Sequence, residues 1–310
     1  MSTPVGVLVM AHGTPGSVEE IEPFYTRIRR GRPPSAAQLD DLVRRYEAIG
    51  GVSPLAERTR SQVDGVAAVL TARQPGRYSV TYGAKHTEPS IELAASELAR
   101  CDVSGIVGLV LTPHRSLRGS GEYLQRAADA IDAARPGLPF TPIEQWFDAP
   151  GLPELLGRRV LDACREIKGA PFVVFSAHSV PVLAGGDPDP YEEQVERSAL
   201  LVAQAAGLDG ASVPWAVAWQ SAGRTDQRWL GPDLLSTLDE LGPTHLDAAV
   251  VCPVGFVADH LEVLYDLDIE ARARAASVGL GFARTASLND DPEFLGILAG
   301  VVESAARTLK

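Results

Sequence analysis

Residues 7–15 read VLVMAHGTP, and residues 173–181 read VVFSAHSVP. Each stretch is an apolar run followed by Ala-His, a small residue, a β-branched residue and proline. Short apolar runs without polar alternation are typical of strands that helices cover on both faces of a parallel sheet. The match therefore predicts an internal repeat in which each copy begins with a buried central strand.

The order of the segments after each copy supports the repeat. A strand that ends in an aromatic residue follows, at Tyr82 and at Trp219, and a strand that ends just before a proline comes later in each half. A chain of 310 residues is also about twice the length of a typical domain. We expect two similar halves, residues 1–150 and 151–310, with the last helix packing back on the first half.

Apolar strands alternate along the chain with segments of helical periodicity, which indicates an α/β protein whose two halves are doubly wound. The clearest expected strands are 5–10, 79–82, 105–111, 172–175, 216–219 and 248–251, and the clearest expected helices are 36–49, 88–99, 191–206 and 292–309.

The composition excludes several classes of protein. The formal net charge is −12, which argues against nucleic acid as a partner, because such binding depends on clustered Lys and Arg. No apolar run is long enough for a transmembrane helix, and the N-terminus does not resemble a signal peptide, so we expect a cytoplasmic protein. Three scattered cysteines, Cys101, Cys164 and Cys252, argue against a disulfide framework or a zinc ribbon.

Histidines stand at the ends of several predicted strands. Ligands of open parallel sheets bind at the carboxyl ends of the strands, so His12, His114 and His178 are candidate functional residues. A histidine at such a place often only anchors a loop. The equivalent positions of His12 and His178 in the two copies favour a shared function, with one imidazole contributed by each half.

Acidic residues recur every fourth position after the strand that ends at Cys252. If this segment is helical from about Asp259, then Glu262, Asp266 and Glu270 form a row along one face, here called the acidic row. A charged row of this kind is usually a solvated surface. No lysine interleaves, however, and such a row suits the passage of hydrated divalent cations or protons.

Cationic and phenolic residues gather in the first half, where they favour an anionic ligand. They include Arg29, Arg45, Tyr46 and Tyr123, although arginines on helices most often only face solvent. Ser53 precedes a proline, which indicates a helix cap, and the helix N-terminus behind it would attract a carboxylate. No glycine-rich loop for nucleotide phosphates and no G-x-S-x-G elbow is found.

Taken together, these segments resemble the ferrochelatases, and most closely the short coproporphyrin ferrochelatases of Gram-positive bacteria. The resemblance covers nearly the whole chain. It implies two Rossmann-like lobes, each with a four-stranded parallel sheet, and a porphyrin in the cleft between them. The matching stretches are VLVMAHGTP, IRRGRPP, RRYEAIGGVSPLAERT, PHRS, VVFSAHSVP, WQSAGRT, WLGPDL and CPVGFVADHLEVLYDLDIE.

The resemblance also implies roles for individual residues. It makes His178 and Glu262 the catalytic pair at the metal-insertion site, with Asp266 and Glu270 as an outer metal site for a divalent cation such as Mg²⁺. The residues that would hold the porphyrin and its propionates are Arg29, Arg45, Tyr46, Ser53 and Tyr123.

One position departs from the family. Where the closest relatives carry a tyrosine as the second axial neighbour of the iron, this chain has His12. A histidine at this strand end is similar to that of the sirohydrochlorin cobaltochelatases. We therefore expect His12 to contact both the metal and the porphyrin, with an axial chemistry that differs from that of the family.

The expected activity is the insertion of Fe²⁺ into a porphyrin in haem biosynthesis, with coproporphyrin III as the favoured substrate. Protoporphyrin IX ferrochelatase and sirohydrochlorin chelatase are the enzymatic alternatives, and a haem or porphyrin carrier is the alternative without catalysis. No cysteine follows Cys252, so no iron-sulfur cluster and no cofactor beyond the Fe²⁺ substrate are expected. We expect a monomer that is not integral to a membrane and that contacts a downstream haem-pathway enzyme transiently.

Overall fold

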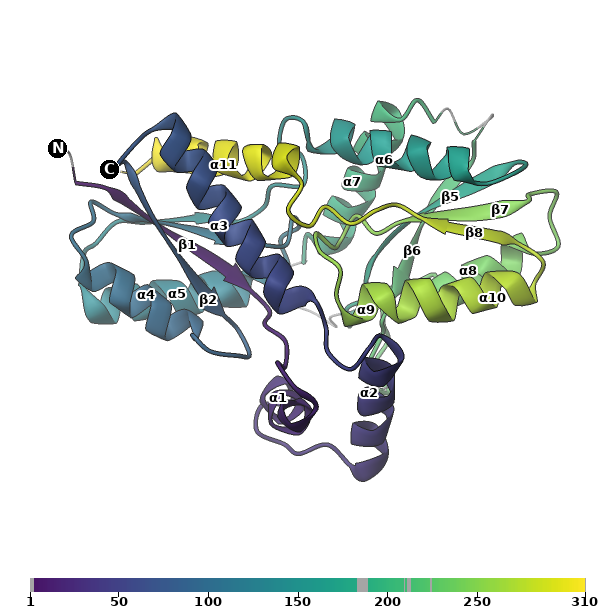
Figure 1. Cartoon of the computed structure of the whole chain (residues 1–310), viewed down its shortest axis with the longest axis horizontal. Coiled ribbons are helices and arrows are strands. Elements are labelled where there is room, and N and C mark those ends of the chain that lie inside the picture. Colours follow the sequence, from purple (N-terminus) through teal and green to yellow (C-terminus); the bar gives the residue numbers. More distant parts are fainter. Residues whose placement is uncertain (1–2, 183–188, 209, 211–212, 224, 310) are drawn as a thin grey trace. The chain divides into compact units, whose positions relative to one another are not determined.

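A computed structural model describes residues 3–182, 189–208, 210, 213–223 and 225–309. Contacts between residues divide the chain into two compact units, and each unit is an α/β structure with its own parallel sheet (Figure 1). The first unit comprises Met1–Trp146, Ala258–Leu261 and Leu288–Lys310, and the second comprises Phe147–Val257 and Glu262–Ser287.

The sheet of the first unit has four parallel strands in the order β2-β1-β3-β4. Its central strand is buried at all seven positions, as the continuous apolar run predicts. The strands are β1 (Val5–Ala11), β2 (Tyr78–Ala84), β3 (Ile106–Val110) and β4 (Phe140–Ile143).

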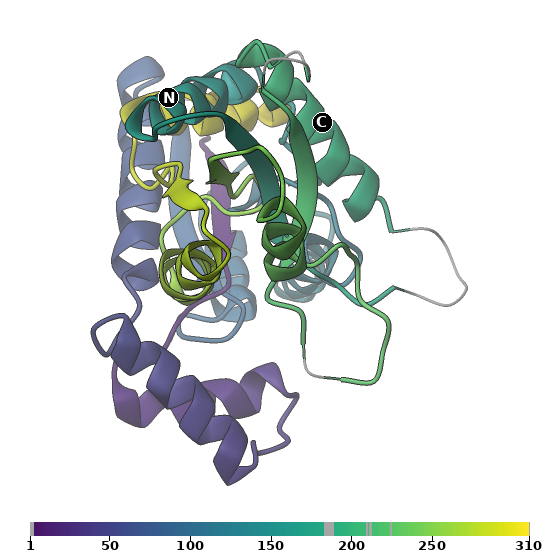
Figure 2. The ribbon, with the colours of Figure 1, turned by 90° about the vertical axis from the view of Figure 1, so that its right-hand side faces the viewer.

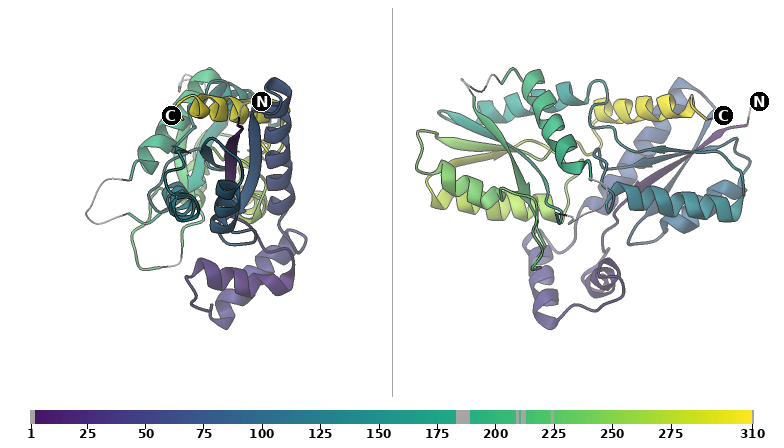
Figure 3. Two further views of the ribbon diagram at one scale, coloured as in Figure 1. Left: turned by 90° about the vertical axis from the view of Figure 1, so that its left-hand side faces the viewer. Right: turned by 180° about the vertical axis from the view of Figure 1, so that it is seen from behind.

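Helices cover both faces of this sheet (Figures 1 and 3). On one face, α4 (Ile91–Arg100) and α5 (Ser120–Ala134) share a buried apolar core with β1 and β3. On the other face, α3 (Leu55–Arg73) packs against α11 (Pro292–Ala306), which also contacts β3 and β4. The last helix of the chain therefore belongs to the first unit.

Two further helices of the first unit lie beyond the sheet and pack against each other (Figure 2). They are α1 (Ile21–Ile28), which follows a 3₁₀ turn at Val18–Glu20, and α2 (Ala36–Ala48). The start of α2 is fixed locally, because the Ser35 hydroxyl accepts a hydrogen bond from the Gln38 amide while the Gln38 side chain accepts one from the Ser35 amide. The segment that connects α1 and α2 carries the arginine-rich stretch of the sequence.

The sheet of the second unit repeats the arrangement of the first, with four parallel strands in the order β6-β5-β7-β8. Helices α6 and α7 pack together on one face, while α8 and α10 cover the other. The strands are β5 (Pro171–His178), β6 (Trp215–Gln220), β7 (Ala248–Cys252) and β8 (Gly281–Arg284). The helices are α6 (Leu152–Glu166), α7 (Tyr191–Ala205), α8 (Leu234–Leu241), α9 (Leu261–Leu264), a π-helix at Asp266–Ala271 and α10 (Arg272–Ser277).

The predicted fold class is confirmed, because both sheets are four-stranded and parallel and β1 and β5 hold equivalent central places in them. Every strand named from the sequence is present. The edge strands β4 and β8 were not predicted, since each has only four residues and contains a proline or a glycine. Among the described residues, no helix has the length and apolar character needed to cross a membrane.

Candidate functional site

The two repeated histidines adopt the same local geometry at the ends of the two central strands. His12 directly follows β1, and its Nδ1 lies 3.1 Å from the carbonyl oxygen of Gly13. His178 is the last residue of β5, and its Nδ1 lies 2.5 Å from the carbonyl oxygen of Ser179. A carbonyl can only accept, so Nδ1 donates in both residues, and in the neutral ring Nε2 is left as a proton acceptor or metal ligand.

In the second unit, His178 faces a carboxylate from the helix that follows β7. Its Nε2 lies 3.5 Å from Oε1 of Glu262, and about a third of each side chain is exposed, 35% and 37%. Burial disfavours the imidazolium, but the charge and hydrogen bond of Glu262, the Ser179 carbonyl and the charge of Asp266 outweigh it and raise the pKa of His178 to about 9. The pair can therefore hold a proton at neutral pH, and this is the arrangement expected from the sequence.

The acidic row follows a different helical geometry from the one expected. The backbone forms a π-helix at Asp266–Ala271, where the Glu270 amide donates to the Tyr265 carbonyl at 2.9 Å across five residues. Asp266 is 6% exposed, whereas Glu270 is exposed at the surface. Within the described parts of the chain, no three His, Cys, Asp or Glu side chains gather closely enough to hold a metal ion. The carboxylates form a row rather than a cage.

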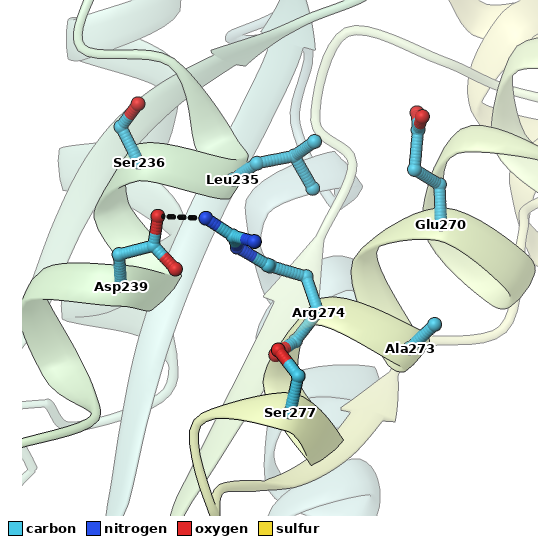
Figure 4. A pocket seen from close by; sticks show the side chains of 7 residues that line it. All are labelled: Leu235, Ser236, Asp239, Glu270, Ala273, Arg274 and Ser277. Carbon is cyan, nitrogen blue, oxygen red and sulfur yellow. Dashed lines mark hydrogen bonds and ion pairs between the residues drawn. The ribbon is translucent and has the colours of Figure 1, made fainter.

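Glu270 lines an open pocket between α8 and α10 (Figure 4). The Arg274 guanidinium in this pocket points toward Asp239 and forms an ion pair with it at 2.5 Å, while the Glu270 carboxylate stands apart from both. Arg274 thus neutralises the charge of Asp239. Glu270, the outer end of the acidic row, faces solvent. The other lining residues are Leu235, Ser236, Ala273 and Ser277.

In the first unit, His12 lies beside a second histidine that the sequence reasoning missed. The pairing of β1 with β2 continues past both strands, because the His86 amide donates to the His12 carbonyl at 3.1 Å. The two rings are 4.7 Å apart between centroids, and the Phe24 ring is 5.9 Å from His12. Burial, together with the nearby positive groups His12, Lys85, Arg126 and Arg27, lowers the pKa of His86 to about 3, so this imidazole is neutral.

Because ligands of parallel sheets bind at the carboxyl ends of the strands, His86 becomes a candidate once β2 is known to reach Ala84. The predicted strand stopped at Tyr82, which left His86 too far along the loop to be considered. The third strand-end histidine, His114, is only 1% exposed, and burial lowers its pKa to about 3. His114 is therefore buried and neutral, and its selection as a candidate functional residue stays a prediction.

Tyr46 and Ser53 both occupy buried positions in the first unit. The Tyr46 hydroxyl lies 3.4 Å from the hydroxyl of Thr14. Thr14 is itself buried and follows the end of β1 by three residues. The Ser53 hydroxyl accepts a hydrogen bond from the Leu55 amide at 3.2 Å, but the N-cap of the helix is Pro54, so the prediction of Ser53 as N-cap was wrong. The helix itself begins at Leu55, so Pro54 lies just before the first helical position.

Arg29 directly follows α1, and Arg45 lies on α2. Arg29 is half-buried, and its Nε donates to the Arg32 carbonyl at 3.2 Å. Arg45 forms an ion pair with Asp41 at 3.2 Å, one turn earlier on α2, and its side chain is 22% exposed. Neither guanidinium is fully buried, so both can meet an anionic group.

Tyr123 is placed differently from these arginines. It lies on α5, is 7% exposed, and carries the Lys85 ammonium 4.8 Å from its ring centroid. Burial raises the pKa of its phenol, so the hydroxyl stays protonated. Lys85, whose side chain is only 11% exposed, also pairs with the more exposed Glu122 at 2.9 Å, and the sequence reasoning selected neither residue.

Comparisons with known proteins identify relatives over the whole length of the chain. The family model described as Ferrochelatase matches residues 4–306. A coproporphyrin III ferrochelatase from Halalkalibacterium halodurans is 41% identical over 304 residues, covering 96% of each chain. A ferrochelatase from Thermus thermophilus is 40% identical over 319 residues, covering 97% of this chain and 99% of that protein. Among solved structures, SirB from Bacillus subtilis has the same fold, with a TM-score of 0.60, 12% identity and coverage of 98% and 96%.

Proposed function

Because the chain belongs to the ferrochelatase family, we propose that it inserts Fe²⁺ into coproporphyrin III to give coprohaem III, as a step of haem biosynthesis. The observation that carries the proposal is the pair formed by His178 and Glu262 at the end of the central strand β5. Insertion of Fe²⁺ into the ring releases two pyrrole protons, which this pair is suited to accept.

The two members of the pair would act in sequence. Once the imidazolium has passed its proton through Glu262, the neutral ring of His178 offers Nε2 to a pyrrole proton or to the incoming Fe²⁺, since Nδ1 is engaged by the Ser179 carbonyl. Glu262 stabilises the resulting imidazolium and takes part in removing the proton from the site. Asp266 and Glu270 would extend this path and serve as an outer site for a divalent cation such as Mg²⁺.

Replacement of His178 tests this assignment. His178→Ala should lower the rate of metal insertion at least about 100-fold, because the positioned proton acceptor is lost, while coproporphyrin still binds. Binding is followed by porphyrin fluorescence and insertion by the visible spectrum. His245→Ala removes an exposed histidine outside both candidate sites and should leave both measurements unchanged. Retained turnover in His178→Ala would exclude His178 from the mechanism.

The choice of coproporphyrin III rests on charge and on relatives. Coproporphyrin carries four propionates and protoporphyrin IX two, so a rim that includes Arg29 and Arg45 favours the former. Tyr46, Ser53 and Tyr123 would complete the porphyrin site, although each is already buried within the first unit. The 41% identical relative is named a coproporphyrin III ferrochelatase, whereas others are named only ferrochelatase.

One experiment separates the candidate substrates. Purified protein is mixed anaerobically with Fe²⁺ and with coproporphyrin III, protoporphyrin IX or sirohydrochlorin, and metalation is followed in the visible spectrum. We expect the highest kcat/KM with coproporphyrin III. A higher value with protoporphyrin IX or sirohydrochlorin would reassign the substrate, and binding without turnover of any of the three would indicate a carrier.

His12 would supply the axial contact on the side of the first unit. Its Nδ1 lies 3.1 Å from the Gly13 carbonyl, so Nε2 is the ring nitrogen that would meet the metal, and more than a third of the residue is exposed. In the complex with coprohaem, His12→Ala should shift the Soret and visible bands, because an imidazole ligand is lost. An unchanged spectrum would remove His12 from the metal site.

The remaining proposals concern the surroundings of the reaction. We propose that the protein is a cytoplasmic monomer, needs no cofactor beyond its Fe²⁺ substrate and contains no iron-sulfur cluster. Cys101 is exposed, Cys164 is half-buried and Cys252 is buried. Coprohaem would pass to a downstream haem-pathway enzyme by transient contact. The mass of the protein in solution tests the monomer, and iron and sulfide analysis of protein purified without air tests the absence of an iron-sulfur cluster.

A further inference from the structure

Gln220 and Ser221 stand at the end of β6 and have no role in the mechanism described so far. Gln220 is 3% exposed, and its amide bridges two buried groups. The Ser176 hydroxyl donates to Gln220 Oε1 at 2.8 Å, and Gln220 Nε2 donates to the main-chain carbonyl of Glu262 at 3.1 Å. One side chain thus joins β5, β6 and the start of the helix that carries Glu262.

The main chain of Gln220 is connected to the other member of the pair. Its carbonyl accepts a hydrogen bond from the Ser179 amide at 2.8 Å, which extends the pairing of β5 and β6 past His178. The Ser179 carbonyl in turn accepts the hydrogen bond from His178 Nδ1. Gln220 is therefore linked to Glu262 through its side chain and to His178 through a single intervening residue.

Ser221 makes the corresponding contact one turn further along the acidic row. Its hydroxyl donates to Asp266 Oδ2 at 2.5 Å. The Ser221 backbone has φ 60°, a left-handed conformation that non-glycine residues rarely adopt, and such strain persists only where surrounding contacts hold it. The end of β6 thus contacts two successive turns of the segment that carries the carboxylates.

We infer that Gln220 is a positioning residue that sets the separation between His178 and Glu262, with Ser221 doing the same for Asp266. The inference rests on the proposed function, because metal insertion requires His178 and Glu262 to be held at a fixed separation. Glutamine fits the position because it offers one acceptor and one donor to two buried partners. An apolar residue would leave the Ser176 hydroxyl and the Glu262 carbonyl without this amide.

The test compares Gln220→Leu with the double variant Ser176→Ala/Gln220→Leu. The single variant should be destabilised, because the buried Ser176 hydroxyl loses its acceptor. The double variant removes this hydroxyl as well and should recover most of the lost unfolding free energy. If Gln220 positions the pair, both variants should show kcat/KM for Zn²⁺ insertion into coproporphyrin III reduced about 10- to 100-fold, as for other residues that orient metal ligands. The Kd for coproporphyrin should stay within about twofold of wild type, since no porphyrin contact is altered.

A control and a second probe keep the inference separate from the proposed function. Thr237→Val removes another buried hydroxyl of the second unit, whose Oγ1 donates to the Asp233 carbonyl at 3.0 Å, and it should cost stability without affecting insertion. Co²⁺ added to the protein without porphyrin should bind about tenfold more weakly to both Gln220 variants than to wild type. Wild-type insertion rates or wild-type Co²⁺ affinity in the double variant would overturn the inference, whichever porphyrin the enzyme uses.

Discussion

The charge of His178 depends on its carboxylate partner, and this makes the stability of the protein depend on pH. The imidazolium has a pKa of about 9 in the folded chain against 6.5 for an ordinary histidine. Folding thus favours the protonated form, so the stabilisation is complete below pH 6.5 and is lost as the pH rises through 9. In Glu262→Gln the main group that raises this pKa is gone, so the variant should lack this loss.

The measurement is the melting temperature of wild type and Glu262→Gln between pH 6 and pH 10 in the absence of metal. We expect the wild type to lose more of its melting temperature than the variant over the interval between pH 6.5 and 9, because only in the wild type does unfolding release a proton from His178 there. Other groups titrate alike in both proteins, so the difference isolates the pair. Parallel curves would show that Glu262 does not control the charge of His178.

Gly13, the residue after His12, offers a test of how the first histidine is held. Gly13 and Gly31 have nearly the same left-handed backbone, φ 83° and 82°. A methyl group on Gly13 would collide with the side chain of Thr87, whereas Gly31 has open space around it. Gly31→Ala should cost about 1 kcal/mol of unfolding free energy, and Gly13→Ala about 1–3 kcal/mol more.

Both variants are measured by urea denaturation of the whole protein. Gly31→Ala serves as the control for the backbone term alone, so the excess in Gly13→Ala reports the crowding against Thr87. Equal losses of unfolding free energy in the two variants would mean that the loop adjusts to the added methyl group without a further energetic cost. In that case the segment would not hold His12 in place.

At the scale of elements, the limits of the sequence reasoning lie at the ends of strands. The apolar core of each strand was recognisable, because continuous β-branched runs are specific for buried parallel strands. The polar residues that follow were harder to assign, since their partners come from other strands. His86 meets His12 only because β2 pairs with β1 in a particular register, and Gln220 meets Glu262 only because β6 lies next to β5.

The helix that carries the acidic row shows a second limit. The spacing of Glu262, Asp266 and Glu270 fits an α-helix in sequence, yet the structure contains a π-helix over part of it. A π-helix is selected by tertiary contacts and not by the propensities of single residues. The hydrogen bond from Ser221 to Asp266 is one such contact, and it comes from a segment 45 residues away.

The last helix, α11, gives a prediction at this scale. Asp291 caps it, because Oδ1 accepts hydrogen bonds from the amides of Glu293 at 2.8 Å and Phe294 at 3.3 Å, with Pro292 at the first position. Asp291→Ala should cost about 1 kcal/mol of unfolding free energy.

The neighbouring Asp290 provides a control. Asp290→Ala should cost less than about 0.5 kcal/mol, because its ion pair with Arg58 is exposed and 3.5 Å long. Urea denaturation distinguishes the two, and equal losses would contradict the capping role.

At the scale of the whole molecule, the repeat predicted from nine residues corresponds to two sheets with the same strand order. The return of the last helix to the first half was expected from the sequence, whereas the assignment of residues 258–261 to the first unit was not. The Trp146 ring lies 5.8 Å from that of Phe294, and Gly65 on α3 leaves room for Leu295. Such complementarity depends on packing between residues far apart in sequence, which no local pattern encodes.

The distribution of charge gives the last prediction. The chain carries a net charge of −12, yet the segment between α1 and α2 is rich in arginine and includes the half-buried Arg29. If these arginines hold propionates, they attract the porphyrin locally, although the net negative charge of the protein repels it. Salt screens such an attraction between charges at the surface, so it should weaken porphyrin binding. Raising the salt from about 0.05 to 0.5 M should weaken coproporphyrin III binding about tenfold, and that of the dianionic protoporphyrin IX less.

Arg29→Gln should reduce this salt dependence, because one of the screened charges is gone. Arg165→Gln removes an exposed arginine of α6 that pairs with Asp162, so it changes the net charge equally while leaving the first unit intact. Fluorescence titration of each variant at several salt concentrations gives the slopes. If the two variants behave alike, only the net charge matters, and the preference for four propionates over two would lose its structural basis in Arg29.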